Sequence, residues 1–290
     1  MSEKGFLIVI DGLDGTGKNT QATILYNFLK DNGVEKIIKI SFPDYESYTG
    51  KIIRDMLTSK LELNPGLWKY HRHFINALLF SYDRMICMNR KMPEYNGKSL
   101  NQLYKEGYVI ICDRYTTSNF FHMTTGLSYI DTKLFIDELE DLEYEKMCII
   151  KPDLVMILSL DPKISMQLIE KRGNEKDDHE NLTHLQKAYE KLNEVLKIKK
   201  DWKVINCNNE EGNYIRASED IQHDIRSVLR DCVAIELIED IINKIDNLDT
   251  IKNEYRINTQ VCPECKHEMT QLLFEPEKYY CPKCESVRII

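Results

Sequence analysis

The sequence predicts an α/β fold: a doubly wound, five-stranded parallel sheet flanked by helices, followed by a small cysteine-rich module. Three observations lead to this prediction. Short apolar, β-branched runs alternate with amphipathic segments over residues 6–230, as expected for a mostly parallel sheet. A glycine-rich loop follows the first run, and two C-x-x-C pairs lie near the end. We therefore expect a main domain at 1–230, a helical linker at 231–254 and the cysteine-rich module at 255–290.

The first strand, loop and helix form one local motif. The apolar run Phe6–Ile10 is typical of a buried parallel strand, and the following glycines cannot continue it. After Lys18 apolar residues recur at helical spacing until Asn32-Gly33 ends the helix. Such a motif surrounds phosphate with backbone N–H groups and a lysine ammonium. The predicted nucleotide-phosphate site comprises Gly12, Leu13, Asp14, Gly15, Thr16, Gly17, Lys18, Asn19 and Thr20.

One position of this loop departs from the P-loop pattern. A P-loop normally has Ser or Thr after the lysine, where the hydroxyl binds Mg²⁺. This chain has Asn19 there, followed by Thr20. Two alternatives stay open: the Asn19 amide oxygen binds the metal, or the metal keeps a water molecule at this position.

Length and charge narrow the class of protein. The 290 residues can hold an α/β domain of about 200 to 220 residues plus an appendage. The net charge of −8 argues against general affinity for nucleic acid or anionic membrane. Residues 2–5 lead directly into the first strand, and no apolar run is long enough to span a membrane, so we expect a soluble, cytoplasmic protein. Five scattered cysteines are expected to be reduced core thiols: Cys87, Cys112, Cys148, Cys207 and Cys232.

The remaining elements alternate along the chain. We predict strands at 36–42, 108–112, 154–160 and 202–207. We predict helices at 49–57, 68–92, 131–144, 161–172, 182–200 and 214–230, with Pro93 ending the long second one. The helix at 131–144 should bury Leu134, Phe135 and Leu139 on its apolar face.

Charged residues at the end of the third strand suit phosphate chemistry. Asp113 follows an apolar strand and is placed to hold Mg²⁺ directly or through water, and Arg114 can bind phosphate with a bidentate fork. The alternative is an ion pair that caps the strand.

Phe80 and Arg84 are spaced i, i+4 and so project from one helical face. Their alternative reading is a core ring and a surface guanidinium.

Together these blocks resemble the thymidylate kinase family of nucleoside monophosphate kinases. The resemblance runs from about residue 6 to residue 230 and rests on G-L-D-G-T-G-K-N-T-Q, Phe42-Pro43, Phe80 with Arg84, D-R-Y-T-T-S-N, and Lys151-Pro152-Asp153-Leu154. It implies a P-loop kinase fold, a homodimer, and transfer of the ATP γ-phosphoryl group to dTMP with Mg²⁺. It also implies that Asp14 contacts the deoxyribose 3′-hydroxyl, Phe80 stacks on thymine, Arg84 bonds the base and Arg114 binds the acceptor phosphate.

Departures from the family pattern point to one branch of it. Many members have Ser at position 19, Arg at 45, and Tyr-Gln where this chain has His122-Met123. A branch with Ala at 19, Phe-Pro-x-Tyr, and D-R-Y-T-T-S-N-x-x-H-Q is more similar. Met123 departs even there, and a thioether in place of an amide leaves selectivity for thymine open. The expected acceptor site is Asp14, Phe42, Pro43, Tyr45, Phe80, Arg84, Arg114, Ser118, Asn119, His122 and Met123.

Residues 171–180 are polar throughout and contain a glycine. A solvated loop is the plain interpretation. In related kinases this position is a lid that closes over the phosphates and brings in cations. The resemblance makes Arg172 and Lys176 the expected lid cations, with Lys171 weaker, and Asp177, His179 and Glu180 positioning the lid. The predicted catalytic set is Lys18, Arg114, Asp14, Arg172 and Lys176.

The C-terminal segment carries a second motif. Residues 233–248 have apolar positions at helical spacing, which indicates a packing or dimer surface. Two C-x-x-C pairs separated by 15 residues form the ligand set of a structural zinc ribbon; redox pairs are the alternative. The ligands are Cys262, Cys265, Cys281 and Cys284.

The charge of this segment narrows its role. Residues 255–290 contain five basic and five acidic side chains, so we expect protein docking or stabilisation rather than nucleic-acid binding. Two functional alternatives stay open. One is a kinase for another or a 5-modified deoxynucleoside monophosphate, which Met123 suggests. The other is a non-catalytic nucleotide-binding adaptor that docks through the ribbon, for which Asn19 is the support.

Overall fold

The computed structural model describes residues 4–58, 60–61, 69–172 and 182–232, together with four short strands between residues 260 and 289. The chain divides into two compact units, Met1–Cys232 and Val233–Ile290. Within the described residues, no helix is long and apolar enough to cross a membrane.

The first unit is built on a five-stranded parallel sheet with the strand order β2-β3-β1-β4-β5. Central strand β1 pairs on both sides, so that Ile8 lies opposite Ile111 of β3 and Leu154 of β4. The prediction of five parallel strands is confirmed. Their bounds are β1 Phe6–Gly12, β2 Ile37–Ser41, β3 Val109–Asp113, β4 Leu154–Ser159 and β5 Lys203–Asn206.

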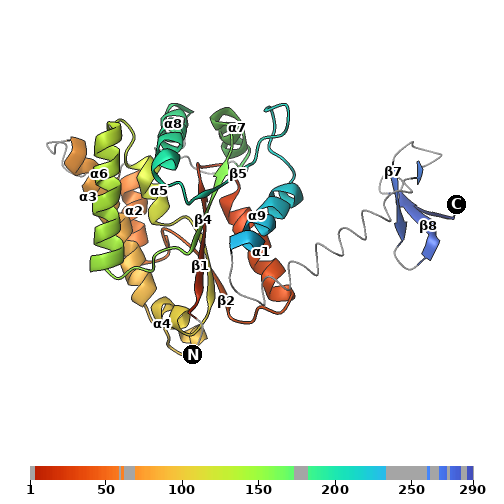
Figure 1. Cartoon of the computed structure of the whole chain (residues 1–290), viewed down its shortest axis with the longest axis horizontal. Helices are drawn as coiled ribbons and strands as arrows, with labels where there is room; N and C mark the ends of the chain where they lie inside the picture. Colours follow the sequence, from red (N-terminus) through yellow and green to blue (C-terminus); the bar gives the residue numbers. More distant parts are fainter. Residues whose placement is uncertain are drawn as a thin grey trace. The chain divides into compact units, whose positions relative to one another are not determined.

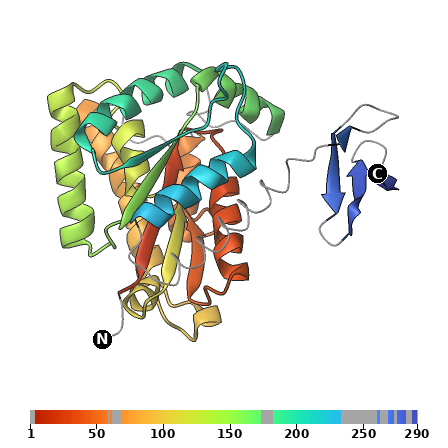
Figure 2. The ribbon, with the colours of Figure 1, turned by 45° about the vertical axis from the view of Figure 1, so that its right-hand side comes forward.

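Helices cover both faces of this sheet (Figures 1 and 2), as a doubly wound fold requires. Helices α1 and α9 pack together on one side, and α2, α3, α5 and α6 lie on the other. Because the central strands are covered on both faces, they are apolar except near their carboxyl ends, where β1 contains Asp11 and β3 contains Asp113. The helices are α1 Lys18–Asp31, α2 Tyr48–Leu57, α3 Lys69–Asn89, α4 Leu100–Lys105, α5 Thr116–His122, α6 Tyr129–Glu140, α7 Pro162–Arg172, α8 Leu182–Ile198 and α9 Ser218–Cys232.

Several predicted helix boundaries were wrong. The helix predicted to reach residue 92 ends at Asn89, because Pro93 forces Met92 into an extended conformation (φ −108°, ψ 112°) and opens a 3₁₀ turn at Pro93–Tyr95. The helix predicted at 131–144 begins at Tyr129, where the Ser128 side chain caps it, and becomes a π-helix at Asp141–Lys146.

Other corrections concern missed helices and exposed side chains. The short helices α4 and α5 were not predicted, and α9 begins at Ser218 rather than at 214 because an Asn208–Ile215 bridge occupies that segment. Leu134 is 51% exposed instead of buried. The five scattered cysteines are all free thiols, but Cys148 is exposed and Cys232 is half-buried, so these two are not the core thiols that were predicted.

The second unit contains an antiparallel sheet with the order β6-β7-β8-β9. Its strands are Gln260–Val261, Glu268–Leu272, Glu275–Cys281 and Ser286–Ile289. The first C-x-x-C pair falls in the connection between β6 and β7, and the second begins at the last residue of β8. Cys262, Cys265, Cys284 and the helix predicted at 233–248 lie outside the described residues, and of Cys281 the structure describes the backbone.

Candidate active site

The phosphate-binding loop joins β1 to α1. Gly15 and Gly17 adopt φ angles of +83° and +85°, which side chains rarely tolerate. A Cβ at Gly15 would lie 2.6 Å from the carbonyl oxygen of Ser165, so this part of the loop packs tightly on α7. A Cβ at Gly17 would meet nothing within 4 Å. The loop therefore has no room for a side chain at Gly15, whereas the space beside Gly17, just before α1 begins, is free of other atoms.

Lys18 folds back over this loop. Its side chain is 6% exposed, and its Nζ donates a hydrogen bond of 2.7 Å to the carbonyl oxygen of Leu13. The same ammonium lies 3.8 Å from Oδ1 of Asp14. Helix α1 begins directly after Gly17, which has no side chain to cap the first N–H donors of the helix. The loop combines a buried cation with an uncapped helix start, an arrangement that binds phosphate.

Asn19 has a cationic partner. Its Oδ1 accepts a 2.8 Å hydrogen bond from Nζ of Lys39, and Lys39 donates a second of 2.8 Å to Oγ1 of Thr23. Thr20 is exposed at the same helix start. Lys39 was not among the predicted site residues. Because the Asn19 oxygen is engaged, the geometry favours the alternative in which a metal keeps water at this position.

Asp113 ends β3 beside this loop and is 7% exposed. Its Oδ2 accepts a 3.3 Å hydrogen bond from Ser41 Oγ, whereas its Oδ1 is buried without a hydrogen-bond partner. Burial raises the pKa of Asp113, the Lys18 charge opposes this rise, and nearby Asp11 adds to it. A buried carboxylate oxygen without a partner fits a divalent cation that also contacts phosphate oxygens. Among the described residues, no three His, Cys, Asp or Glu side chains form a metal-binding cluster.

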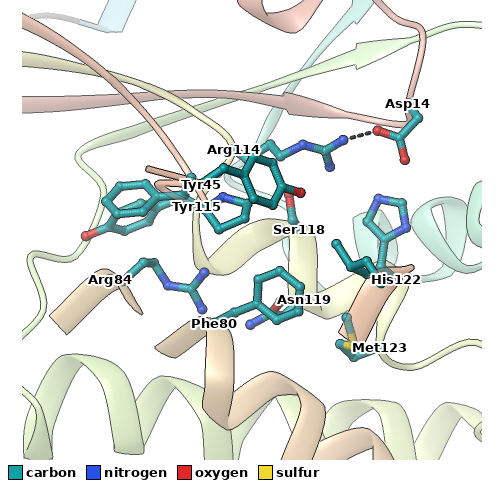
Figure 3. Close-up of a pocket in the computed structure, with 13 residues that line it drawn as sticks. Asp14, Tyr45, Phe80, Arg84, Arg114, Tyr115, Ser118, Asn119, His122 and Met123 are labelled. Carbon is teal, nitrogen blue, oxygen red and sulfur yellow. Dashed lines mark hydrogen bonds and ion pairs between the residues drawn. The ribbon is translucent and has the colours of Figure 1, made fainter. Parts of the chain in front are cut away.

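Arg114 reaches from the end of β3 toward Asp14. It adopts a φ of +64°, unusual for a residue with a side chain, and its N–H donates a 3.1 Å hydrogen bond to the carbonyl oxygen of Ile10. Its guanidinium contacts Oδ1 of Asp14, as the dashed line in Figure 3 shows. Asp14 therefore lies between two cations, Lys18 and Arg114.

A pocket lies beside Arg114 and brings together all eleven predicted acceptor-site residues (Figure 3). Leu57 and Tyr115 also line it and were not predicted. Nδ2 of Asn119 is buried without a hydrogen-bond partner, and Met123 is 5% exposed. The predicted residues in the lining are Asp14, Phe42, Pro43, Tyr45, Phe80, Arg84, Arg114, Ser118, Asn119, His122 and Met123.

Arg84 is held in this pocket by Glu143 of the π-helix. Arg84 is 1% exposed, which rules out the surface alternative. Its Nε lies 2.8 Å from Oε2 of Glu143, and its Nη2 lies 2.5 Å from Oε1. Burial alone would lower the pKa of Arg84, but the Glu143 charge outweighs it and the pKa is raised. The guanidinium therefore stays charged.

Glu143 is also bonded by Ser81 Oγ at 2.6 Å and Thr116 Oγ1 at 2.5 Å, so it joins three elements. Glu143 was not among the predicted site residues, because nothing in the local sequence pattern distinguishes it from Glu145.

Two further buried carboxylates shape the site. Asp83 accepts hydrogen bonds from Thr49 Oγ1 at 2.6 Å and from the Asp44 N–H at 3.0 Å, which fixes the segment that carries Phe42 and Tyr45. Asp11 accepts hydrogen bonds from α5, including one of 2.8 Å from Ser118 Oγ. Both were missed; a single Asp within an apolar strand was the signal for Asp11.

The predicted lid falls mostly outside the described residues. Arg172 is the last residue of α7, and Lys171 beside it is exposed. Lys176, Asp177, His179 and Glu180 lie in the segment 173–181, which the structure does not describe. The described residues thus include the glycine-rich loop and the pocket beside it, whereas most of the predicted lid lies outside them.

The site belongs to a chain with many relatives. The family model "Thymidylate kinase" matches residues 10–217. A thymidylate kinase from Caldicellulosiruptor saccharolyticus is 32% identical over 231 residues, which cover 79% of this chain and 97% of that protein. A probable thymidylate kinase from Pyrococcus horikoshii is 28% identical over 232 residues, covering 78% of this chain and 97% of that protein.

Solved structures share the fold. Thymidylate kinase from Candida albicans superimposes with a TM-score of 0.56 at 21% identity, covering 78% of this chain and 91% of that one. The enzyme from Ehrlichia chaffeensis gives a TM-score of 0.51 at 19% identity, covering 78% and 100%. With the family model matched over most of residues 1–232 and the P-loop and pocket in place, the chain belongs to the thymidylate kinase family.

Proposed function

We propose that this chain is a phosphotransferase that moves the γ-phosphoryl group of ATP to dTMP and produces dTDP. One observation carries the proposal: a P-loop with a buried lysine faces a pocket lined by an aromatic ring, a buried arginine and an unpaired amide, with Arg114 at the junction. The relatives in the family, named thymidylate kinases, support dTMP as the acceptor.

The donor side needs positioning and charge neutralisation rather than covalent chemistry. Lys18 and the loop N–H groups would hold the β- and γ-phosphates of ATP. Mg²⁺, when bound, would neutralise charge on the phosphate oxygens, and Asp113 offers its unpaired Oδ1 as the protein ligand. Arg172 and Lys176 are proposed to complete the cationic surroundings from the lid.

The acceptor side divides into a phosphate end and a base end. Arg114 binds the acceptor phosphate with its planar fork, and Asp14 holds that fork in the pocket and accepts from the deoxyribose 3′-hydroxyl. Phe80 stacks on the pyrimidine ring, and the Nη1 donors of Arg84, which no described residue engages, face the base. The Asn119 amide supplies a further polar contact.

Two other functions are less well supported. A kinase for a different or 5-modified monophosphate rests on Met123, and a non-catalytic adaptor rests on Asn19. The relatives favour neither. The retained Lys18, Asp113 and Arg114 also argue against lost catalysis.

The test is ADP release from ATP and Mg²⁺ with dTMP as acceptor. We expect Lys18→Ala and Arg114→Ala each to lower turnover by about 10²- to 10³-fold, as removal of a charge-stabilising group does. Lys36→Ala is the matched control, because Lys36 is exposed and donates to the carbonyl oxygen of Glu106 away from the loop. Near-normal turnover of either site variant, in protein that unfolds in urea like the unaltered chain, would contradict these roles.

For the second unit we propose a structural zinc site formed by Cys262, Cys265, Cys281 and Cys284. Both C-x-x-C pairs occur at connections between antiparallel strands, which supports a ribbon, and its neutral charge favours a protein partner over nucleic acid. Metal analysis of the full chain should find one zinc per chain, absent from Cys262→Ser. Disulfides within each pair and no zinc would instead support the redox alternative.

We also propose a homodimer formed through α3 and α6. These helices pack together through Phe74 and Phe135, whose ring centroids are 5.9 Å apart. Their outer faces carry Tyr82, Ile130 and Leu134, which are 48%, 71% and 51% exposed. Exposed apolar side chains on neighbouring helices are of the kind that interaction surfaces use. Sedimentation should give twice the chain mass, and a monomer at micromolar concentration would contradict the proposal.

A further inference from the structure

We propose that Lys39 is a positioning residue of the donor site: its ammonium withholds the Asn19 oxygen from the metal and places a fixed positive charge beside the donor phosphates. This inference rests on the ATP site of the proposed function. Lys39 would then let the chain bind ATP with less dependence on Mg²⁺ than a P-loop with a hydroxyl at position 19 allows.

The strand register brings Lys39 to the loop. In edge strand β2, Lys39 lies opposite Ile111 and Ser41 lies opposite Asp113. Residues two apart point to the same face of a strand, so Lys39 and Ser41 both face α1 and the end of β3. Lys39 then bonds Asn19 and Thr23, which are one turn apart on α1, at 2.8 Å each. The ammonium is fixed between two oxygens at the start of the helix.

This placement has an electrostatic cost without an anion. The start of a helix carries partial positive charge, so a lysine ammonium there is unfavourable unless an anion binds nearby. Lys18 already supplies a second ammonium at the first residue of the same helix. The Lys39 charge acts on the carboxyl group of Asp113, where it opposes the rise in pKa that burial causes. Two fixed cations beside the loop match the multiple charges of a triphosphate.

The metal then has different ligands from those in a P-loop with Ser or Thr. There the hydroxyl after the lysine binds Mg²⁺ together with an Asp from a neighbouring strand. Here the side-chain oxygen at position 19 is engaged by Lys39, whereas Oδ1 of Asp113 has no hydrogen-bond partner. Asp113 would be the residue that offers a carboxylate oxygen to Mg²⁺, and the Lys39 charge would replace part of the charge that a tightly held metal provides.

Calorimetric titration of the full chain with ATP tests this inference, because it reads binding without any acceptor or turnover. Each protein is titrated once with Mg²⁺ and once with EDTA. We expect Lys39→Met to weaken binding of metal-free ATP by about fivefold, the loss expected for one partly exposed charge. Binding of MgATP should change by less than twofold, because the metal supplies charge and the Asn19 oxygen becomes available.

Two controls separate charge from structure. Lys39→Arg keeps the positive charge and should bind metal-free ATP within about twofold of the unaltered chain. Lys36→Met removes a lysine at the opposite end of β2, whose Nζ bonds the Glu106 carbonyl oxygen at 2.9 Å, and should bind like the unaltered chain in both buffers.

If Lys39→Met and the unaltered chain bound metal-free ATP with equal affinity, this inference would be overturned and the proposed function would still stand. An equal loss of ATP affinity with and without Mg²⁺ would also overturn it, because Lys39 would then serve only to hold strand β2 against helix α1. If the unaltered chain bound no ATP in either buffer, the proposed function would fall, and this inference with it.

Discussion

The two buried carboxylates beside the glycine-rich loop, Asp11 and Asp113, differ in the number of hydrogen bonds that their oxygens accept. Asp11 is fully buried and accepts hydrogen bonds from the Gly12 N–H and from the hydroxyls of Thr117 and Ser118. Asp113 has a single hydroxyl partner, Ser41, and an unpaired second oxygen. Because unpaired buried acceptors are costly, Asp113 is suited to a ligand, whereas Asp11 fixes the start of the loop.

Asp113→Asn should therefore stabilise the nucleotide-free protein. Burial raises the folded-state pKa of Asp113, so its protonated form is favoured by folding. That favourable contribution is complete below about pH 4, the ordinary Asp value, and is lost as pH rises through the raised pKa. An Asn side chain cannot ionise, so the variant does not lose stability as the pH rises. The melting temperature of the variant should exceed that of the unaltered chain at pH 7, with the difference shrinking toward pH 4.

Thermal unfolding between pH 4 and pH 8 checks this prediction. Addition of MgATP should stabilise Asp113→Asn less than the unaltered chain, because the metal loses its carboxylate ligand. A difference in melting temperature that is constant over this pH range would show that Asp113 does not titrate as argued.

At the scale of elements, α3 connects both halves of the acceptor pocket. Phe80 and Arg84 line the pocket, whereas Asp83 fixes the segment that follows β2. Glu143 of the π-helix joins α3 to α5 through Arg84, Ser81 and Thr116. The orientation of Arg84 in the pocket thus depends on a residue 59 positions away.

Glu143→Gln should be strongly destabilising. It leaves the buried Arg84 charge without its counter-ion, a change that costs about 3 kcal/mol or more in the free energy of unfolding. Glu106→Gln is the control, since Glu106 pairs with Lys98 at 2.6 Å with both side chains about 40% exposed, and surface pairs contribute at most about 1 kcal/mol. Urea unfolding measures both. Similar changes in the two variants would refute the buried network.

Local patterns explain what could be predicted from the sequence at these scales. The loop around Gly15 and Lys18 and the five apolar strands are encoded by adjacent residues, so their periodicity and glycines were informative. Glu143, Asp83 and Lys39 act across 20 to 59 positions, through contacts with Arg84, Thr49 and Asn19. Nothing in a one-dimensional pattern pairs such residues. The α5 helix was missed because its seven residues are polar at the start and fully buried.

At the scale of the whole molecule, the match to the family model lies within the first of the two units, Met1–Cys232. The family model matches residues 10–217. The alignments with the relatives from Caldicellulosiruptor saccharolyticus and Pyrococcus horikoshii cover 79% and 78% of this chain and 97% of each relative. The second unit, Val233–Ile290, carries its own antiparallel sheet. The boundaries at 230 and 254, the zinc ribbon and the cytoplasmic location stay predictions.

The central claim is phosphoryl transfer to dTMP, and the most direct measurement compares acceptors in the ADP-release assay with ATP and Mg²⁺. We predict that dTMP gives the highest kcat/KM among dTMP, dUMP, dCMP and dGMP, exceeding dUMP by about tenfold, the usual effect of one methyl group in an apolar pocket. Higher kcat/KM for another nucleotide, or no turnover with any of the four, would contradict the claim.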